Sequence, residues 1–516
     1  MTLLTKAPLY ILSLLSLQAV AKPSCSIKTT KEIISGNYIP TRAPSSTLFT
    51  DTLNFTAASA GDTMSAISIP QNLNGWVGTE QYILMTYGVV RSFNKVTGIR
   101  DNILNLNTDN FFGISTNDVR IVYNRFAKRW IFSAESTDPV DFVPRDIMVI
   151  VSGSDVITET TPWLAYTIPY ADISPGFPAG ALDYQQLASD ANSIYIVANA
   201  FDDVDFTNYV GSSAITISLD SAVNGGPLEY TVFTGLLEDI NSQYIPPADN
   251  FNTDPTYGYL LNAVVDYNNA PPTGSDQLAF FRISDPGSSS ATLTGPLFIT
   301  VPPFGYADVA PHLGNKYAAE GYLQSGNALM WAPHVRGNFL FAAHDIQLNL
   351  DGEGSDTGDR IGVRWYQFDL TGGTGIEAPG TVPTLVQSGT LFDNVSVVNP
   401  KFYFNASIMT NKNLDLVISS TVSGEEDYTN VVYAARAATD APGTLREPVL
   451  LTNFENPYNF GPLVQIDVGV LLGQRWGDES SLSPDPINDL ELWNTQEHAS
   501  TNNAWAINVT KLVPVA

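Results

Sequence analysis

The sequence predicts an all-β protein folded as a single β-propeller, most simply with seven blades, six or eight being the alternatives. One sequence pattern recurs with different residues each time: an apolar strand, a polar turn, then a second strand rich in β-branched and aromatic residues. Helical periodicity is scarce, and the 38 glycines and 33 prolines punctuate the whole chain. Four-stranded sheets repeated around an axis produce this pattern, and two β-sandwiches are the competing architecture. The clearest copies of the unit are 119–133, 187–200, 328–343, 407–420 and 481–495.

Each blade is expected from a group of short apolar strands bounded by turn residues. Pro-Pro pairs at 246–247, 271–272 and 302–303 break the middle of the chain into turns. The strand groups predict blades at 66–114, 117–170, 183–235, 243–302, 325–392, 400–452 and 473–516.

The N-terminus has the pattern of an export signal. Lys6 supplies positive charge, residues 7–17 are apolar, and Ala19-Val20-Ala21 fits a small-residue cleavage site. The domain organisation predicted from the sequence is therefore a signal peptide at 1–21, an arm at 22–65 and the propeller at 66–516.

Composition excludes several classes of partner. The net charge of −28, from 24 basic and 52 acidic residues, argues against nucleic acid and anionic membrane surfaces. After residue 21 the chain has no apolar run of the roughly 18 residues that a membrane helix needs. Cys25 is the only cysteine, so no intrachain disulfide can form. We expect a secreted, extracellular monomer, with the periplasm or the cell surface as alternatives.

Three blocks of sequence resemble a broad group of secreted bacterial β-propeller proteins, mostly uncharacterised and sometimes labelled sialidase-like. They are NGWVGTEQYILMTY at 74–87, DVRIVYNRFAKRW at 118–130 and RWGDESSLSPDPINDLELWNTQE at 475–497. The resemblance runs from about residue 66 to the C-terminus and implies a propeller and export, with no agreed reaction. The chain departs from the group at Val119, where proline is common, and at Glu479, where tyrosine is common. It also lacks the S-x-D-x-G-x-x-W boxes of true sialidases, which argues against that activity.

Candidate ligand-binding residues are polar side chains at the starts of the innermost strands, where a propeller's loops converge. Arginine can bind a carboxylate bidentately, and aspartate can bind sugar hydroxyls or a cation. The alternative is that these groups brace the blades through buried hydrogen bonds. The candidates are Arg120, Asp183, Tyr184, His334, Asn405, Arg475 and Asp478.

Two acidic loops suggest calcium binding, the second of which contains Asp202, Asp203 and Asp205. The first gives the candidate metal site. Asp351, Glu353, Asp356 and Asp359 place oxygen ligands at alternating positions, as calcium loops do, although Gly362 stands where an EF-hand has its glutamate. Solvated acidic turns are the alternative. No other cofactor is expected, because H-E-x-x-H, C-x-x-C and G-x-S-x-G are all absent.

The function predicted from these features is binding outside the cell, with a glycan or a protein as ligand at the mouth of the central channel. The alternative is a carbohydrate-active enzyme, a glycoside hydrolase or lyase, that uses carboxylates at that mouth. Whether the protein is an enzyme stays open at this point. Trp76 and Trp163 are the tryptophans expected to be exposed, and Trp130, Trp331, Trp365 and Trp493 are expected in the core.

Overall fold

The computed structural model describes residues 46–515, except 63–72, 87, 142, 270, 318–320, 327–329, 461–463, 466–471 and 502. The predicted signal peptide and residues 22–45 of the predicted arm lie outside the described residues. The chain divides by its contacts into residues 1–40 and 41–516, and the second unit is the one described below. Within the described residues no helix is both long and apolar enough to cross a membrane.

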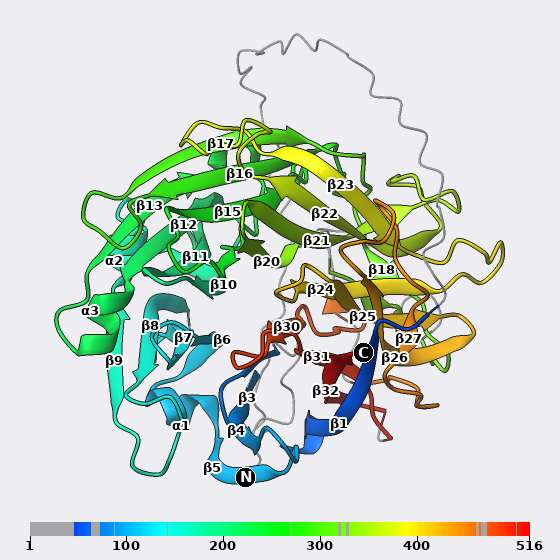
Figure 1. Ribbon diagram of the computed structural model, residues 1–516, viewed down its shortest axis with the longest axis horizontal. Helices are drawn as coiled ribbons and strands as arrows, with labels where there is room; N and C mark the ends of the chain where they lie inside the picture. Colours follow the sequence, from blue (N-terminus) through cyan, green and yellow to red (C-terminus); the bar gives the residue numbers. More distant parts are fainter. Residues whose placement is uncertain are drawn as a thin grey trace, which may run out of the picture. The chain divides into compact units, whose positions relative to one another are not determined.

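Seven groups of antiparallel strands form a β-propeller ring, which confirms the predicted fold class (Figure 1). In the first three blades the strands pair in chain order from the axis outward. These blades are β2 (Asn74–Val77), β3 (Gln81–Thr86), β4 (Val89–Asn94) and β5 (Arg100–Leu106); β6 (Thr116–Asn124), β7 (Arg129–Thr137), β8 (Pro144–Ser152) and β9 (Trp163–Ile168); and β10 (Ala181–Ser189), β11 (Ser193–Phe201), β12 (Tyr209–Ser218) and β13 (Tyr230–Leu236).

The fourth and fifth blades share an inner segment. The fourth blade has three strands, β15 (Tyr257–Ala263), β16 (Gln277–Ser284) and β17 (Thr292–Thr300). Pro247 bridges to Leu260 of β15, and the chain then continues as β14 (Asp249–Asn250), which pairs in parallel with β20 of the fifth blade. The fifth blade therefore has five strands: β14, β20 (Met330–Arg336), β21 (Phe339–Leu348), β22 (Arg360–Asp369) and β23 (Thr384–Leu391).

The sixth blade is β24 (Phe402–Thr410), β25 (Leu416–Gly424), β26 (Asp427–Arg436) and β27 (Val449–Leu450). The seventh blade draws on both ends of the described chain. Its inner strands are β30 (Ser481–Pro484), β31 (Leu492–Ala499) and β32 (Trp505–Pro514), and its outer strand is β1 (Phe49–Ser59). β1 pairs antiparallel with β32 from Phe49 opposite Pro514 to Ser59 opposite Ala506. Residues 49–59, which the sequence analysis assigns to the arm, are thus a blade strand that closes the ring.

Asx turns explain the repeated unit that the sequence shows. Asn124 Oδ1 accepts from the backbone N–H of Phe126 and Ala127 between β6 and β7. Asp190 Oδ1 does the same for Asn192 and Ser193 between β10 and β11, and Asn411 Oδ1 for Asn413 and Asp415 between β24 and β25. Asn and Asp favour such turns because their side chains satisfy the backbone donors that the reversal leaves unpaired.

Helix is confined, among the described residues, to short connections: α1 (Thr108–Phe112), α2 (Tyr170–Ile173), α3 (Leu219–Asn224), η1 (Ala60–Asp62) and η2 (Glu238–Ile240). Two-residue strands complete the chain: β18 (Val309–Ala310), β19 (Leu323–Gln324), β28 (Val464–Gln465) and β29 (Leu472–Gly473). The connections are too short to cover a sheet face, so each blade must bury its faces against its neighbours.

The hydrophobic core lies between blades. Trp130, Trp365 and Trp493 are fully buried and Trp331 is nearly so, as expected from the sequence. Trp493 stacks on Tyr82 of the first blade at 5.4 Å between ring centroids, so the last blade packs on the first. Trp76 is buried as well, which corrects the expectation that it is exposed, because β2 lies next to the ring axis between neighbouring blades.

Candidate functional site

Four inner strands carry the same backbone irregularity near their beginnings. The strand pairing shifts register at this point in β6, β10, β20 and β24. The irregular residues have positive φ angles: Asp118 39°, Tyr184 61°, Ala332 47° and Asn405 50°. Non-glycine residues rarely adopt this conformation, and β-bulges re-aim side chains near sites and barrel rims. All four lie at the end of the ring where the inner strands begin, which we call the strand-start end.

Two buried or partly buried ion pairs meet at the strand-start end. Arg120 Nη1 and Nη2 contact Glu479 Oε2 and Oε1 at 2.7 and 2.5 Å, with side chains 3% and 1% exposed. Arg475 Nη2 contacts Asp478 Oδ2 at 3.1 Å and is 27% exposed. The second blade and the segment before β30 are thereby joined. With Asp118, Asp183 and Tyr184, these four residues form what we call the axial cluster.

Asp183 differs from the other carboxylates of the axial cluster because it has no hydrogen bond or ion pair to any described residue, and it is only partly buried. Burial, together with the nearby carboxylates of Asp118 and Asp478, raises its pKa to about 7 against the opposing effect of Arg475 and Arg120. Both arginines already hold other carboxylates. Asp183 is therefore an accessible acid that the protein itself leaves without a cation.

Burial likewise raises the pKa of Asp478, with Arg475 opposing. It raises the pKa of Glu479 well above its usual range, with Arg120 opposing. For both groups desolvation outweighs the attraction of the paired guanidinium. The axial cluster thus contains more carboxyl groups than guanidinium groups in a largely buried region.

Aromatic rings continue from the axial cluster. Tyr184 lies 4.8 Å from Tyr244 and 5.6 Å from Trp331 between ring centroids. Tyr244 lies 6.1 Å from Tyr267, which lies 6.1 Å from Tyr306. Tyr184, Tyr244 and Tyr267 are partly exposed. Tyr184 Oη and Trp331 Nε1 are buried atoms with no hydrogen-bond partner among the described residues.

Other carboxylates at this end brace the ring. Two of them accept a backbone N–H from the inner strand of the neighbouring blade: Glu135 Oε1 from Gln185 at 3.1 Å, and Asp345 Oδ2 from Asn405 at 2.5 Å. Glu497 Oε2 accepts from Gly477 at 2.8 Å, in the segment that leads into β30 of the same blade. The first two contacts are interblade bracing, which is the alternative role expected for polar groups at this end. Bracing and an accessible site coexist at the same end.

The structure brings five of the seven predicted ligand-binding residues together and separates two. Arg120, Asp183, Tyr184, Arg475 and Asp478 belong to the axial cluster. Asn405 is 1% exposed, and its amide donates to the carbonyl of Gly477, so it holds the turn that carries Asp478 rather than facing a ligand.

His334 is fully buried between the fifth and sixth blades. Its Nε2 accepts from the backbone N–H of Thr410 at 3.0 Å, which places the ring proton on Nδ1, 3.3 Å from the carbonyl of Ala332. Burial lowers its pKa to about 3, with Arg336 acting in the same direction. A neutral histidine joining two strands has a structural role, and the prediction that it meets the ligand lacks support here.

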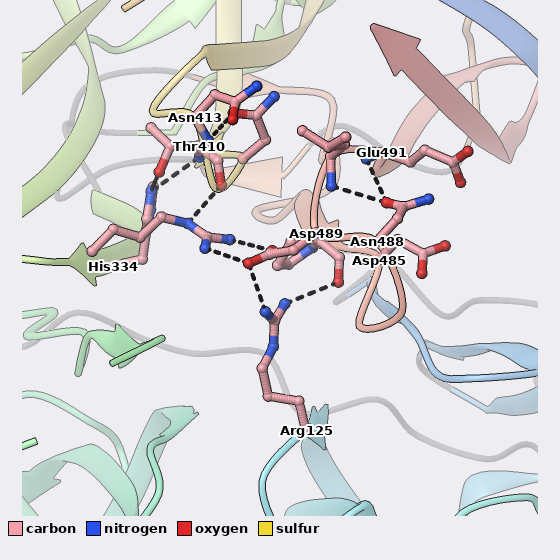
Figure 2. Close-up of polar contacts among 12 residues, drawn as sticks. Arg125, His334, Thr410, Asn413, Asp485, Asn488, Asp489 and Glu491 are labelled. Carbon is pink, nitrogen blue, oxygen red and sulfur yellow. Dashed lines mark hydrogen bonds and ion pairs between the residues drawn. The ribbon is translucent and has the colours of Figure 1, made fainter. Parts of the chain in front are cut away.

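At the opposite end of the axis, the loop between β30 and β31, residues 485–491, makes polar contacts with several blades (Figure 2). Asp489 accepts from Arg336 at 2.7 and 2.8 Å and from Arg125 at 3.0 Å. Asp485 accepts from Lys95 at 2.8 Å. These partners come from the first, second and fifth blades, so one loop of the seventh blade ties together strands from across the ring.

The predicted calcium ligands do not come together as a set. Asp351 Oδ1 accepts from the backbone N–H of Glu353, Asp356 Oδ1 accepts from Gly274 and Tyr306, and Asp359 pairs with Arg360. Over the part of the chain that the structure describes, no three His, Cys, Asp or Glu side chains are grouped so that they could hold a metal ion. The calcium interpretation of residues 351–359 gains no support from this geometry.

Comparison with known proteins identifies no family for this chain. No protein-family model matches the chain, and no curated protein matches it. Similar solved structures include Drosophila Semaphorin 1a extracellular domains 1-2, with 9% identity, 89% of this chain and 88% of that chain covered, and a TM-score of 0.38. Penicillium chrysogenum α-L-arabinanase complexed with arabinobiose has 10% identity, coverages of 75% and 98%, and a TM-score of 0.35. Trypanosoma rangeli sialidase has 10% identity, coverages of 85% and 57%, and a TM-score of 0.34. Scores this low carry no argument about activity, ligand or partner.

Three residues of the site escape the sequence reasoning. Glu479 attracted notice only as a departure from the tyrosine common in similar sequences, yet it is the ion-pair partner of Arg120. Tyr244 follows a turn and belongs to no apolar strand, so no periodicity points to it. Trp331 was expected in the core; it is buried, but its indole N–H faces no described acceptor.

Proposed function

We propose that the protein is an exported binding propeller that recognises a glycan at the strand-start end of its axis. The observation that carries the proposal is the convergence of Asp183 and Tyr184 of the third blade with Arg475 of the segment before β30, each still partly exposed, beside a run of aromatic rings. Binding sites typically combine an apolar or aromatic surface with a few convergent polar groups.

The chemistry of this end matches a sugar ring. Sugars present hydroxyl groups, which both donate and accept, and C–H faces, which pack on aromatic rings. The Asp183 carboxylate is partly exposed, has no hydrogen-bond partner among the described residues, and can accept from a sugar hydroxyl. The partly exposed ring of Tyr184 can pack on the C–H face of the same sugar.

Charge narrows the ligand class. Arg120 and Arg475 each form an ion pair with a carboxylate of the protein, whereas Asp183 forms no ion pair with a described residue. A sugar carboxylate would therefore meet excess negative charge, and a neutral or amino sugar would not. The proposal excludes sialylated and uronic-acid glycans as preferred ligands.

The test is a glycan-array experiment on the mature chain from Lys22, with neutral, amino and acidic sugars on the same array. Binding to neutral or amino sugars, reduced at least tenfold in Asp183→Asn and in Tyr184→Ala, is the expected result. Arg145→Ala is the matched control, since Arg145 pairs with Asp141 on the second blade, outside the axial cluster. Selective binding of acidic glycans contradicts the charge argument, and no glycan binding at all leaves a protein partner as the better hypothesis.

Glycoside hydrolysis is the second candidate, favoured by one observation. Asp183 has a pKa of about 7 and lies within electrostatic range of Asp478, and acids whose environments shift their pKa values are typical of glycosidases. Release of reducing sugar from a bound glycan, abolished in Asp183→Asn while Arg475→Ala mainly weakens binding, is the expected outcome. Binding without turnover at any pH between 5 and 8 would remove the enzyme from consideration.

A further inference from the structure

The chain contains four N-x-S/T sequons, at Asn54, Asn394, Asn405 and Asn508. Their asparagine side chains differ in exposure and in hydrogen bonding. Asn405 and Asn508 are 1% and 2% exposed. The amide of Asn405 donates to the carbonyl of Gly477 inside the ring. Neither side chain has room for a sugar in the folded protein.

The Asn54 side chain makes hydrogen bonds where β1 pairs with β32 and closes the ring. Its Nδ2 donates to the carbonyl of Leu451 at 2.8 Å, and its Oδ1 accepts from Nδ2 of Asn508 at 2.6 Å. A sugar on Nδ2 would crowd both contacts where β1 joins β32. These side-chain contacts therefore disfavour modification of Asn54, although its side chain reaches the surface.

Asn394 differs from the other three asparagines because its side chain is exposed and makes no hydrogen bond to any described residue. It lies in the loop between β23 and β24. The Asp393 carboxylate holds the loop by accepting from the backbone N–H of Val395, Ser396 and Lys401 at 3.0, 2.9 and 3.0 Å. The loop thus presents the Asn394 amide outward in a defined conformation.

Three valines beside this amide are unusually exposed. Val395, Val397 and Val398 are 79%, 73% and 75% exposed. Contiguous exposed apolar side chains normally mark a surface that something covers. A glycan attached at Asn394 reaches these valines directly, and the C–H faces of its first sugars can pack on them.

We propose that Asn394 is an N-glycosylation site whose glycan covers these three valines. In the reaction the amide nitrogen forms a bond to C1 of a glycosyl diphosphate donor. The bond between C1 and the diphosphate oxygen breaks, the diphosphate leaves with the electron pair, and the amide loses one proton. The proposal shares only export with the proposed function and is independent of the axial cluster.

The experiment uses the full chain secreted by eukaryotic cells and purified from the medium. Peptide N-glycosidase converts each glycosylated asparagine to aspartate, so peptide mass spectrometry reads all four sequons at once. We expect full conversion at Asn394 and none at the other three. Ser396→Ala should abolish the modification and Ser396→Thr should keep it, while Asn399→Gln, on the same loop but outside any sequon, should have no effect.

A second readout tests the covering of the valines. Removing the glycan from the folded protein should increase the fluorescence of a hydrophobic dye, and the triple serine variant of the three valines should show no such increase. An unmodified Asn394 in secreted protein overturns the site. Folded protein modified at Asn405 or Asn508 overturns the structural argument, and an unchanged dye signal overturns the covering role.

Discussion

The ion pair between Arg120 and Glu479 allows a sharp test of how the axial cluster is built. Arg120→Leu leaves the Glu479 carboxylate, 1% exposed, without its guanidinium. Breaking a buried pair from one side costs about 3–5 kcal/mol. With an unfolding entropy on the order of 1 kcal/mol/K for a chain of this length, the midpoint of thermal unfolding should fall by roughly 3–5 °C at neutral pH.

The two partners should respond differently to pH. Burial already raises the pKa of Glu479, and loss of Arg120 raises it further, so in Arg120→Leu a proton can neutralise the orphaned acid. The destabilisation should therefore shrink as pH falls from 8 to 5. Glu479→Gln removes the titrating acid and leaves an arginine that keeps its charge, so in that variant the pair should contribute no pH dependence to stability over the same range.

Differential scanning calorimetry of both single variants and of Arg120→Leu/Glu479→Leu completes the cycle. Replacing a buried pair by apolar side chains is often nearly neutral, so the double variant should recover most of the lost stability. Additive losses in the double variant, or single losses below about 1 kcal/mol, would refute a buried and mutually dependent pair.

Three further predictions follow from the described contacts. Burial raises the pKa of Asp345 to about 7, above its value in the unfolded chain. Its contribution to stability is therefore complete below about pH 4 and is lost as the pH rises through 7. The free energy of unfolding in urea should decline less between pH 5 and pH 8 in Asp345→Asn than in the native chain. Asp489→Ala removes three charge-assisted contacts at the end of the axis opposite the axial cluster, and because Asp489 is 21% exposed we expect a loss of about 1–3 kcal/mol that decreases in high salt. A chain beginning at Gly61 lacks β1 and should be recovered as aggregate, whereas one beginning at Ser46 should be soluble; a soluble monomer without β1 would contradict its closing role.

The fold could be predicted because its signals are local. Each hairpin is encoded within about 15 residues by apolar strands and an Asx turn, as at Asn124 and Asp190, so blade positions follow from the sequence. The placement of β1 could not be predicted in this way. Its partner β32 lies at the other end of the chain, and no local pattern reports a pairing over that separation.

The site could be predicted in part for a similar reason. Polar residues at the starts of inner strands must converge, which correctly gathers Arg120, Asp183 and Arg475. The same rule fails for His334, because a strand residue one pleat further along faces a neighbouring blade instead of the axis. It also fails for the calcium loop, since alternating acids form a metal site only when the backbone turns them inward, and here they cap backbone N–H groups and an arginine.

The position of β1 in the seventh blade also sets an order of events in time. Among the described residues, β1 is the first strand to be synthesised and its partner β32 is the last. The other six blades can assemble from consecutive hairpins as the chain emerges, but the seventh must wait until β32 has been made. Until then the edges of β1 are unpaired and can associate with wrong partners. A chain interrupted anywhere before β32 therefore leaves the ring open.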